Sequence, residues 1–204
     1  MSRAREIADL IGGPTPDIIL KTADGAILNL QTSDTTVTDG SVLGKINFQA
    51  PNEGSGTDSI LIAASIQAEA EGTFSASNNA TSVIIYTGES EAAETDGGGK
   101  FTFDSFGQLF LKNTSNADNS VPALRLETGD TDIAADDMLG RIMFSAPDEG
   151  AGTDAILTGA EIRAVSEGDF SSSNNATKLV FMTGASEGAT SKFEIASDGS
   201  LSTP

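Results

Sequence analysis

The side chains best suited to chemistry in this sequence are acidic, and they recur in two nearly identical loops. Glu53 and Asp58 lie in APNEGSGTD, and Glu149 and Asp154 lie in APDEGAGTD. A pair of carboxylates can serve as the general acid and the nucleophile or base of glycoside hydrolysis. Such a site also needs a cleft with aromatic platforms, and these loops contain no aromatic residue. We therefore interpret both loops as glycine-rich acidic turns, in which Asp58 and Asp154 accept hydrogen bonds from backbone N–H groups.

A second acidic cluster, GDTDIAADD, contains Asp130, Asp132, Asp136 and Asp137. Clustered carboxylate oxygens are the ligands that Ca²⁺ prefers. The corresponding segment SDTTVTDG keeps only Asp34 of this set, and it lacks the glycine and terminal glutamate spacing of an EF-hand loop. A solvated acidic turn is the favoured interpretation. We predict neither a metal ion nor another cofactor.

The amino-acid composition excludes most other kinds of catalytic site. The 204-residue chain has no His, the commonest general base, and no Cys, which excludes disulfides, thiol nucleophiles and Cys-zinc sites. Asn79 and Asn175 begin Asn-Ala-Thr triplets that match the weak N-glycosylation pattern, and we interpret them as Asx turns. We predict that this protein is not an enzyme.

The charge balance limits the kinds of partner. The formal net charge is −19, with 30 acidic and 11 basic residues. Such a surface repels phosphate backbones and anionic lipid, so we expect neither nucleic acid nor a membrane as partner. Arg3 and Arg5 are too few to bind nucleic acid, and docking onto an acidic or grooved protein is favoured. No apolar run approaches the roughly 20 residues of a membrane-spanning helix, and no secretory signal is present.

The acidic loops are positioned by a module that the chain contains twice. With a constant offset of 96, residues 28–93 match residues 124–189 at 35 of 66 positions. The offset falls to 92 after the glycine-rich stretch 95–99, where KFTFDSFGQL corresponds to KFEIASDGSL. Self-similarity at a fixed offset predicts repeated structural units. We expect an N-terminal segment, 1–16, followed by two β modules, 17–106 and 107–204.

Residues 1–13 are the only segment with clear helical periodicity. Ile7, Leu10 and Ile11 fall at i, i+3 and i+4 and form one apolar stripe. Ser2 can cap the start of the helix, and the glycine pair 12–13 ends it. An isolated helix of this length is marginal in water, so we expect it to order only when it docks against a partner.

From Asp17 the hydrophobic periodicity changes to two, which predicts β-strands. The predicted strands are 17–22, 26–32, 41–50, 60–70 and 81–87, and the opening pair recurs at 108–114 and 122–128. Alternation along 60–70 predicts a buried face that includes Ile66 and a wetter face that includes Ser65 and Gln67. The continuous apolar run of 81–87 predicts burial on both faces. The repeated phenylalanines are interpreted as core anchors: Phe48, Phe74, Phe144 and Phe170.

Large hydrophobic side chains are sparse in each module. The chain has ten Phe, one Tyr and no Trp, so a single module buries only a thin core by itself. The predicted fold is all-β: two tandem antiparallel modules of sandwich-like or prism-like form, with a short N-terminal helical anchor. We expect the modules to complete their core by intertwining or packing with identical chains.

Two parts of the sequence resemble phage virion proteins. The opening MSRAREIADLIG resembles the start of many virion appendage proteins of marine cyanophages and related podoviruses and myoviruses. The unit LGxIxFxAPxEGxGTDAIL…AxIxAxxEGxF…NATxLxFxTGxSE…KFxIxSDGxL is similar to the stem repeats of phage tail fibres. It extends from Leu43 to Leu109 and from Leu139 to Leu201, so the resemblance covers nearly the whole chain.

The resemblance implies an elongated, β-rich homotrimer on the virion, fastened by a short N-terminal segment, with distal parts that contact the host cell surface. It assigns Arg3, Arg5, Ile7, Leu10 and Ile11 to virion attachment. The implied partner of this segment is another virion protein of the tail, adaptor, nozzle or capsid. The chain ends at DGSLSTP, where longer relatives continue into tip or self-cleaving chaperone domains. We therefore expect the proximal part of a fibre or a short appendage.

The resemblance thus predicts a structural virion protein, a trimeric tail fibre or fibre-like appendage that supports host adsorption. The alternative is a capsid decoration or head-fibre protein on the shell surface, which the same anchor and β modules would serve. An enzymatic tailspike is disfavoured because the chain lacks His and has few aromatic residues.

Overall fold

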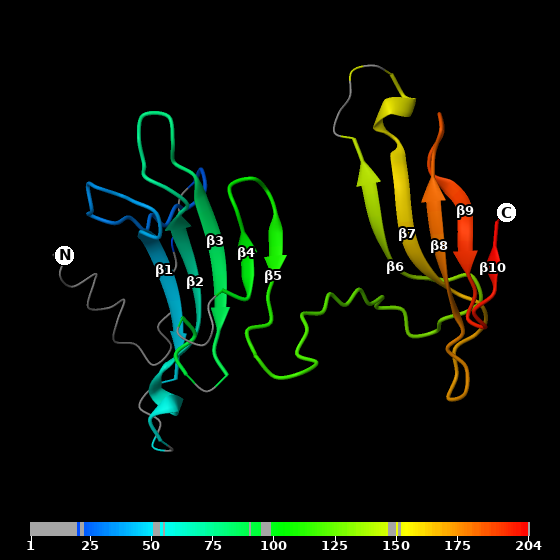
Figure 1. Ribbon diagram of the computed structural model, residues 1–204, viewed down its shortest axis with the longest axis horizontal. Coiled ribbons are helices and arrows are strands. Elements are labelled where there is room, and N and C mark those ends of the chain that lie inside the picture. The colour runs from blue at the N-terminus through cyan, green and yellow to red at the C-terminus, as the bar shows by residue number, and fades with distance from the viewer. Residues whose placement is uncertain are drawn as a thin grey trace. The chain divides into compact units, whose positions relative to one another are not determined.

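The computed structural model describes residues 20, 23–50, 54, 56–89, 91–94, 99–146, 150 and 152–203. Two five-stranded sheets are present, one in each of two units, Met1–Ala123 and Leu124–Pro204 (Figure 1). All neighbouring strands are antiparallel. The prediction of an all-β fold with two antiparallel modules is confirmed. The helix predicted at 1–13 lies outside the described residues, as does the strand predicted at 17–22 except for Leu20.

The first sheet is a meander in which each strand pairs with the next. Its strands, in sequence and in space, are β1 (Val42–Gln49), β2 (Ile62–Ala70), β3 (Thr81–Thr87), β4 (Phe101–Phe103) and β5 (Leu109–Leu111). A one-turn 3-10 helix, Asp58–Ile60, precedes β2. The predicted strands at 41–50, 60–70 and 81–87 thus correspond to β1, β2 and β3, and the 3-10 turn accounts for the later start of β2.

The second sheet repeats this order. Its strands are β6 (Met138–Ser145), β7 (Thr158–Ser166), β8 (Thr177–Thr183), β9 (Thr190–Ile195) and β10 (Leu201–Ser202). A second 3-10 turn, Asp154–Ile156, precedes β7. Among the described residues, no helix is long and apolar enough to cross a membrane.

A tight turn explains why the chain reverses between β4 and β5. One carboxylate oxygen of Asp104 accepts hydrogen bonds from the backbone N–H groups of Phe106 (3.0 Å) and Gln108 (2.7 Å). Gly107 has a φ of 78°, a left-handed conformation that glycine adopts without steric cost. β5 therefore closes the first sheet.

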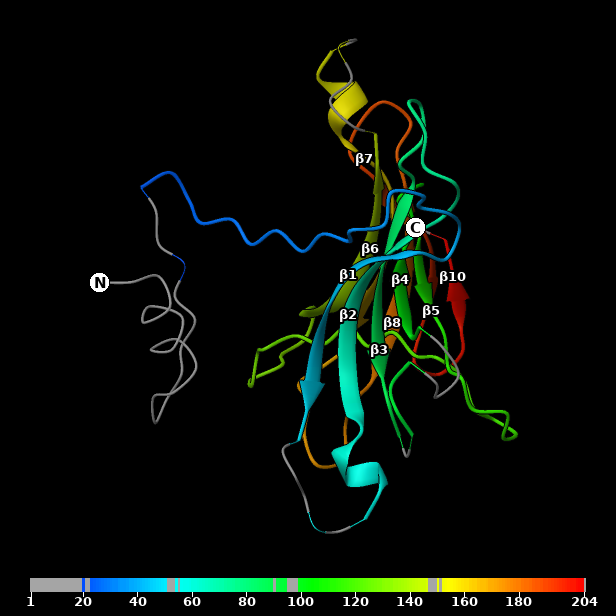
Figure 2. The ribbon, with the colours of Figure 1, turned by 90° about the vertical axis from the view of Figure 1, so that its left-hand side faces the viewer.

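The strands predicted at 26–32 and 122–128 are wrong, because neither segment joins a ladder. The segment before β1 instead runs crosswise to the strands (Figure 2). Leu30 lies against Gly44, where an added Cβ would stand 2.6 Å from the Leu30 Cβ. Leu126 lies against Gly140 in the same way, at 2.9 Å. Glycine at both positions permits a close approach that any side chain would obstruct.

Candidate interaction surface

One face of the first sheet carries only apolar side chains and glycine along two rows. Residues directly opposite each other on neighbouring strands point to the same face, so the register identifies the rows. The first row is Ile46, Ile66, Ile85, Phe101 and Leu111, and the second is Gly44, Ala68, Val83, Phe103 and Leu109. We call this surface the apolar face of the first unit.

The apolar face is largely uncovered in the single chain. Ile46 is 43% exposed, Phe101 44% and Phe103 48%, and Phe48 at the margin is 52% exposed. A contiguous exposed apolar patch on a chain with this much charge marks a site of association. The apolar face is therefore the strongest candidate for a functional surface.

The second unit repeats this surface. Its rows are Ile142, Ile162, Phe181 and Phe193, and Gly140, Ala164, Leu179, Ile195 and Leu201. The rings of Phe181 and Phe193 pack with centroids 5.8 Å apart. A hollow of about 170 Å³ lies on this face, with Leu126, Ile142 and Leu179 among its lining residues. Both units thus present an apolar face of the same design.

The opposite face of the first sheet is the buried one, which corrects two predictions. Ser65 is fully buried and Gln67 is 5% exposed, whereas Ile66 is 38% exposed. The loop after β3 folds back along β2, where the N–H groups of Gly88 and Ala93 donate to the carbonyls of Ala63 and Ile62. This loop covers the mixed polar face and leaves the apolar face open.

The same arrangement determines how β3 and the phenylalanines are buried. Ile84 and Tyr86 are buried together with Ala93, but Val83 is 42% exposed, so β3 is buried on one face rather than on both. Phe48 and Phe144 are exposed in the single chain, so their assignment as core anchors is wrong for an isolated chain. Phe74 and Phe170 are half-buried.

Charged groups on the covered face of the first unit are paired. The Lys45 ammonium donates to both carboxylate oxygens of Glu94, at 3.0 and 3.1 Å, and the Ser65 hydroxyl donates to the same carboxylate at 3.4 Å. The side-chain amide of Gln67 donates to Glu69 at 2.8 Å. Burial, followed by the negative charges of Glu69 and Glu94, raises the pKa of Tyr86 above its usual value.

The covered face of the second unit holds a more buried carboxylate. Glu161 is 6% exposed and lies between two arginines, 4.0 Å from Arg141 and 3.8 Å from Arg163. One oxygen of Glu161 and the Nε of Arg163 are buried without a hydrogen-bond partner. Lys178 and Glu194 form a neighbouring ion pair at 3.7 Å.

Three of the acidic residues singled out from the sequence accept local hydrogen bonds. Asp130 accepts the N–H of Asp132 at 3.0 Å, and Asp137 accepts the N–H of Ala134 at 2.7 Å. Asp58 accepts a hydrogen bond from the Thr57 hydroxyl at 3.2 Å. Across the described ranges, no group of three or more acidic, His or Cys side chains is placed to hold a metal ion.

Of the two carboxylate pairs considered in the sequence, Glu53 and Glu149 lie outside the described part of the chain. The predicted attachment residues Arg3, Arg5, Ile7, Leu10 and Ile11 lie outside it as well.

The closely copied SNNAT loops are explained by local hydrogen bonds. The Asn78 side chain accepts the N–H of Ala80 and donates to the carbonyl of Thr73, and Asn174 makes the equivalent bonds. The Asx turn is therefore made by Asn78, one residue before the predicted Asn79. In the second unit the Asx turn is likewise made by Asn174 and not by the predicted Asn175.

Sequence reasoning missed a contact that both units contain. The Glu71 carboxylate accepts hydrogen bonds from the N–H (3.1 Å) and the hydroxyl of Ser105. Glu167 accepts the equivalent bonds from Ser197. The signal was present, because both glutamates and both serines are repeated. These bonds join the loop after the second strand of each sheet to its last hairpin.

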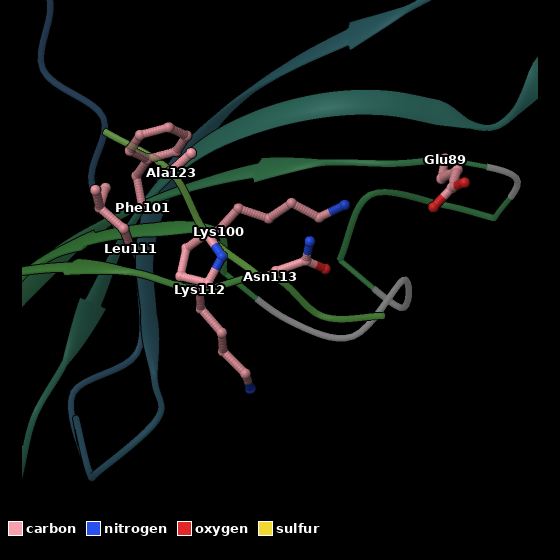
Figure 3. Close-up of a pocket in the computed structure, with 8 residues that line it drawn as sticks. Glu89, Lys100, Phe101, Leu111, Lys112, Asn113 and Ala123 are labelled. Carbon is pink, nitrogen blue, oxygen red and sulfur yellow. The ribbon is translucent and has the colours of Figure 1, made fainter. Parts of the chain in front are cut away.

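A separate hollow of about 270 Å³ adjoins the ends of β4 and β5 (Figure 3). Its lining residues are Glu89, Lys100, Phe101, Leu111, Lys112, Asn113, Pro122 and Ala123. The side chains of Lys100 and Asn113 extend toward the side of the hollow on which Glu89 lies, and Lys112 extends in another direction (Figure 3). Two lysines therefore border one hollow of a strongly acidic protein.

Comparison with known proteins gives similarity to solved structures only. No family model matches the chain, and no curated protein matches it. The carboxy-terminal domain of the bacteriophage T5 L-shaped tail fibre is similar, with 15% identity and a TM-score of 0.40, over 91% of this chain and 88% of that one. The same domain with its intramolecular chaperone domain gives 13% identity and a TM-score of 0.42, over 92% of this chain and 62% of that one.

Proposed function

We propose that this chain is a structural virion protein, a homotrimeric tail fibre or fibre-like appendage that supports adsorption of a phage to its host. One observation carries the proposal: in both units, two neighbouring apolar rows of one sheet face are largely exposed in the single chain. The stem-repeat motifs from Leu43 to Leu109 and from Leu139 to Leu201 supply the resemblance to fibres.

The buried core of the single chain is small. Its buried hydrophobic residues among the described ones are Ala70, Ile84, Tyr86, Ala93, Val165, Val180 and Met182. Folding must offset roughly 1–2 kcal/mol of backbone entropy per ordered residue, and a core of this size is a weak source of that free energy. Covering the apolar faces would add burial at roughly 25 cal/mol per Å² of apolar surface.

Identical chains are suitable partners for these faces. The two rows of the apolar face of the first unit contain no charged residue. Copies that each carry a net charge of −19 can therefore approach there without placing like charges in contact. The acidic residues then face solvent and keep neighbouring assemblies apart. Three copies with their apolar faces turned inward would form the homotrimer that the motifs imply.

The N-terminal segment 1–16 completes the proposal as the attachment to another virion protein, with Arg3, Arg5, Ile7, Leu10 and Ile11 as contact residues. The β modules would form the stem, and no catalytic step is assigned to either. The location that follows is the virion.

Light scattering of the purified chain, with and without residues 1–16, tests this function. The expected result is a trimer in both forms, with a mass of three times 20.8 kDa for the full chain and correspondingly less for the shortened one, together with rod-shaped particles by electron microscopy. A trimer that forms only when residues 1–16 are present would show that this segment, and not the β modules, drives assembly. A monomer in both forms that binds capsids lacking tails would overturn the fibre and favour a decoration protein.

A further inference from the structure

Lys100 and Lys112 face each other across the last hairpin of the first sheet. The N–H of Lys112 donates to the carbonyl of Lys100 at 3.0 Å, and their neighbours Phe101 and Leu111 are paired in the register. The two lysines are therefore directly opposite each other. Like charges at such positions destabilise a sheet, and the divergence of the two side chains (Figure 3) reduces that cost in the single chain.

Among the basic residues that the structure describes, these two lysines are the ones with neither an acidic partner nor a side-chain hydrogen bond. Lys45, Arg125, Arg141, Arg163 and Lys178 each lie within 4.0 Å of a carboxylate. Lys192 donates to the Thr190 hydroxyl at 2.7 Å. Neither Lys100 nor Lys112 forms an ion pair within the described part of the chain, although acidic residues outnumber basic ones by 30 to 11.

The hollow that both lysines border shares two lining residues with the apolar face. Phe101 and Leu111 line the hollow and belong to the row that begins at Ile46. A molecule that covers this row therefore contacts two of the residues that line the hollow. The charged lining residues are Lys100, Lys112 and Glu89, which leaves one positive charge in excess.

We infer that the hollow bordered by Lys100 and Lys112 receives an acidic side chain from a second copy of this chain. The inference rests on the homo-oligomer of the proposed function. Charge complementarity supports it, because each copy carries a net charge of −19 and the hollow presents unpaired positive charge. The carboxylate would relieve the repulsion between the lysines and hold two copies in one register, since charge pairs at interfaces contribute mainly to specificity.

The second unit supplies a matched control. Lys192 is the equivalent of Lys100 at an offset of 92, and the residue at the same offset from Lys112 is Pro204. The opposed lysine pair is therefore specific to the first unit. Lys192→Gln removes the same charge from a position that already has a hydrogen-bond partner.

The test compares the full chain with the double variant K100Q/K112Q and with K192Q. Light scattering over a dilution series, at about 50 mM and about 500 mM NaCl, spans weak and strong screening. We expect the double variant to need about tenfold more protein for half-assembly at low salt, with a smaller salt dependence. We expect K192Q to match the natural chain. Circular dichroism should show that the double variant folds at least as stably, because the repulsion is gone.

Three results would overturn the inference, and each is distinguishable. If the natural chain is oligomeric and K100Q/K112Q assembles identically at both salt concentrations, the hollow is not part of the interface, although the proposed function stands. If the natural chain is monomeric throughout, the proposed function fails as well. If inorganic phosphate raises the melting temperature of the natural chain, but not of the double variant, without changing its mass, the occupant is a free anion.

Discussion

The two units share their apolar faces but differ in the charges on the opposite faces. Lys45 and Arg141 occupy equivalent positions, and each lies near a carboxylate. In the first unit that carboxylate is Glu94, at the start of the four-residue insertion after β3. In the second unit, which lacks the insertion, it is Glu161 on β7, at the position of Ser65. A carboxylate is present in both units although it comes from different elements.

This difference shows which features each face requires. The apolar rows keep isoleucine at 46 and 142 and at 66 and 162, as expected of surfaces that contact the same partner. On the covered faces a carboxylate lies near the equivalent basic residue in both units, but the element that supplies it differs. The four predictions below test this contrast, from the largest expected effect to the smallest.

A charge on either apolar face should abolish assembly. Ile66→Asp and Ile162→Asp each place a carboxylate in the middle of a row, where association would leave it buried and unpaired. We expect a loss of affinity between copies of about a hundredfold or more, measured by light scattering. Asn47→Asp adds the same charge to the opposite face of β1 and should leave the mass unchanged. Equal loss from all three variants would contradict a face-specific interface.

Removal of the carboxylate from each covered face should have unequal costs. Glu161→Gln leaves two arginines beside a buried neutral amide, which should lower the free energy of unfolding by about 3 kcal/mol. Glu94→Gln removes a half-exposed ion pair and should cost less than about 1 kcal/mol. Urea unfolding measures both changes. Similar costs would mean that the burial of Glu161 does not distinguish the two units.

A side chain at Gly44 or Gly140 should displace the segment whose leucine packs against that glycine. An added Cβ would stand 2.6 Å from Leu30 at Gly44 and 2.9 Å from Leu126 at Gly140. Gly44→Ala and Gly140→Ala should each cost about 1–2 kcal/mol, and Gly44→Ala more. Hydrogen exchange in 26–31 and 122–127 should increase. Gly159→Ala, whose nearest neighbour would be 3.7 Å away, is the control and should change stability by less than about 0.5 kcal/mol.

High pH should weaken the first unit through Tyr86. Its pKa is raised in the folded state, so its contribution to stability is complete below the ordinary tyrosine pKa, about 10, and is lost as pH rises through the folded value. The equivalent residue of the second unit is Met182, which does not titrate. Tyr86 is the only tyrosine, so ultraviolet absorbance of tyrosinate reports it alone.

Comparison with Tyr86→Phe separates the contribution of Tyr86 from other effects of high pH. A natural chain that titrates with an unshifted tyrosine pKa would contradict this prediction.

Local periodicity and the repeat were sufficient to predict the first three strands of each sheet. Alternation identified β1, β2 and β3, and the offset of 96 placed their counterparts in the second unit. Alternation also separated Ser65 and Gln67 from Ile66, but it could not show which set is buried in one chain. The return of the loop 88–94 onto β2 determines this, and no short-range pattern encodes where a loop lies.

The candidate surface was predictable only in part. The segment 26–32 has a strand pattern, yet Leu30 crosses Gly44, so a tertiary contact overrides the local preference. The rows of the apolar face require the register between strands, which hydrophobicity leaves undetermined for β4 and β5 because they are only three residues long. The pairing of Lys100 with Lys112 could not be predicted from the sequence, because eleven residues separate them and the register of β4 with β5 was unknown.

In each unit, two contacts between residues distant in sequence hold a loop or an extended segment against the sheet, and both partners of each contact belong to the same unit. Leu30–Gly44 and Glu71–Ser105 lie within the first unit, and Leu126–Gly140 and Glu167–Ser197 lie within the second. Duplication or deletion of the coding segment for one unit would therefore leave the contacts of the other intact. The length of this protein can evolve by recombination in whole-unit steps, without passing through an intermediate that breaks a sheet.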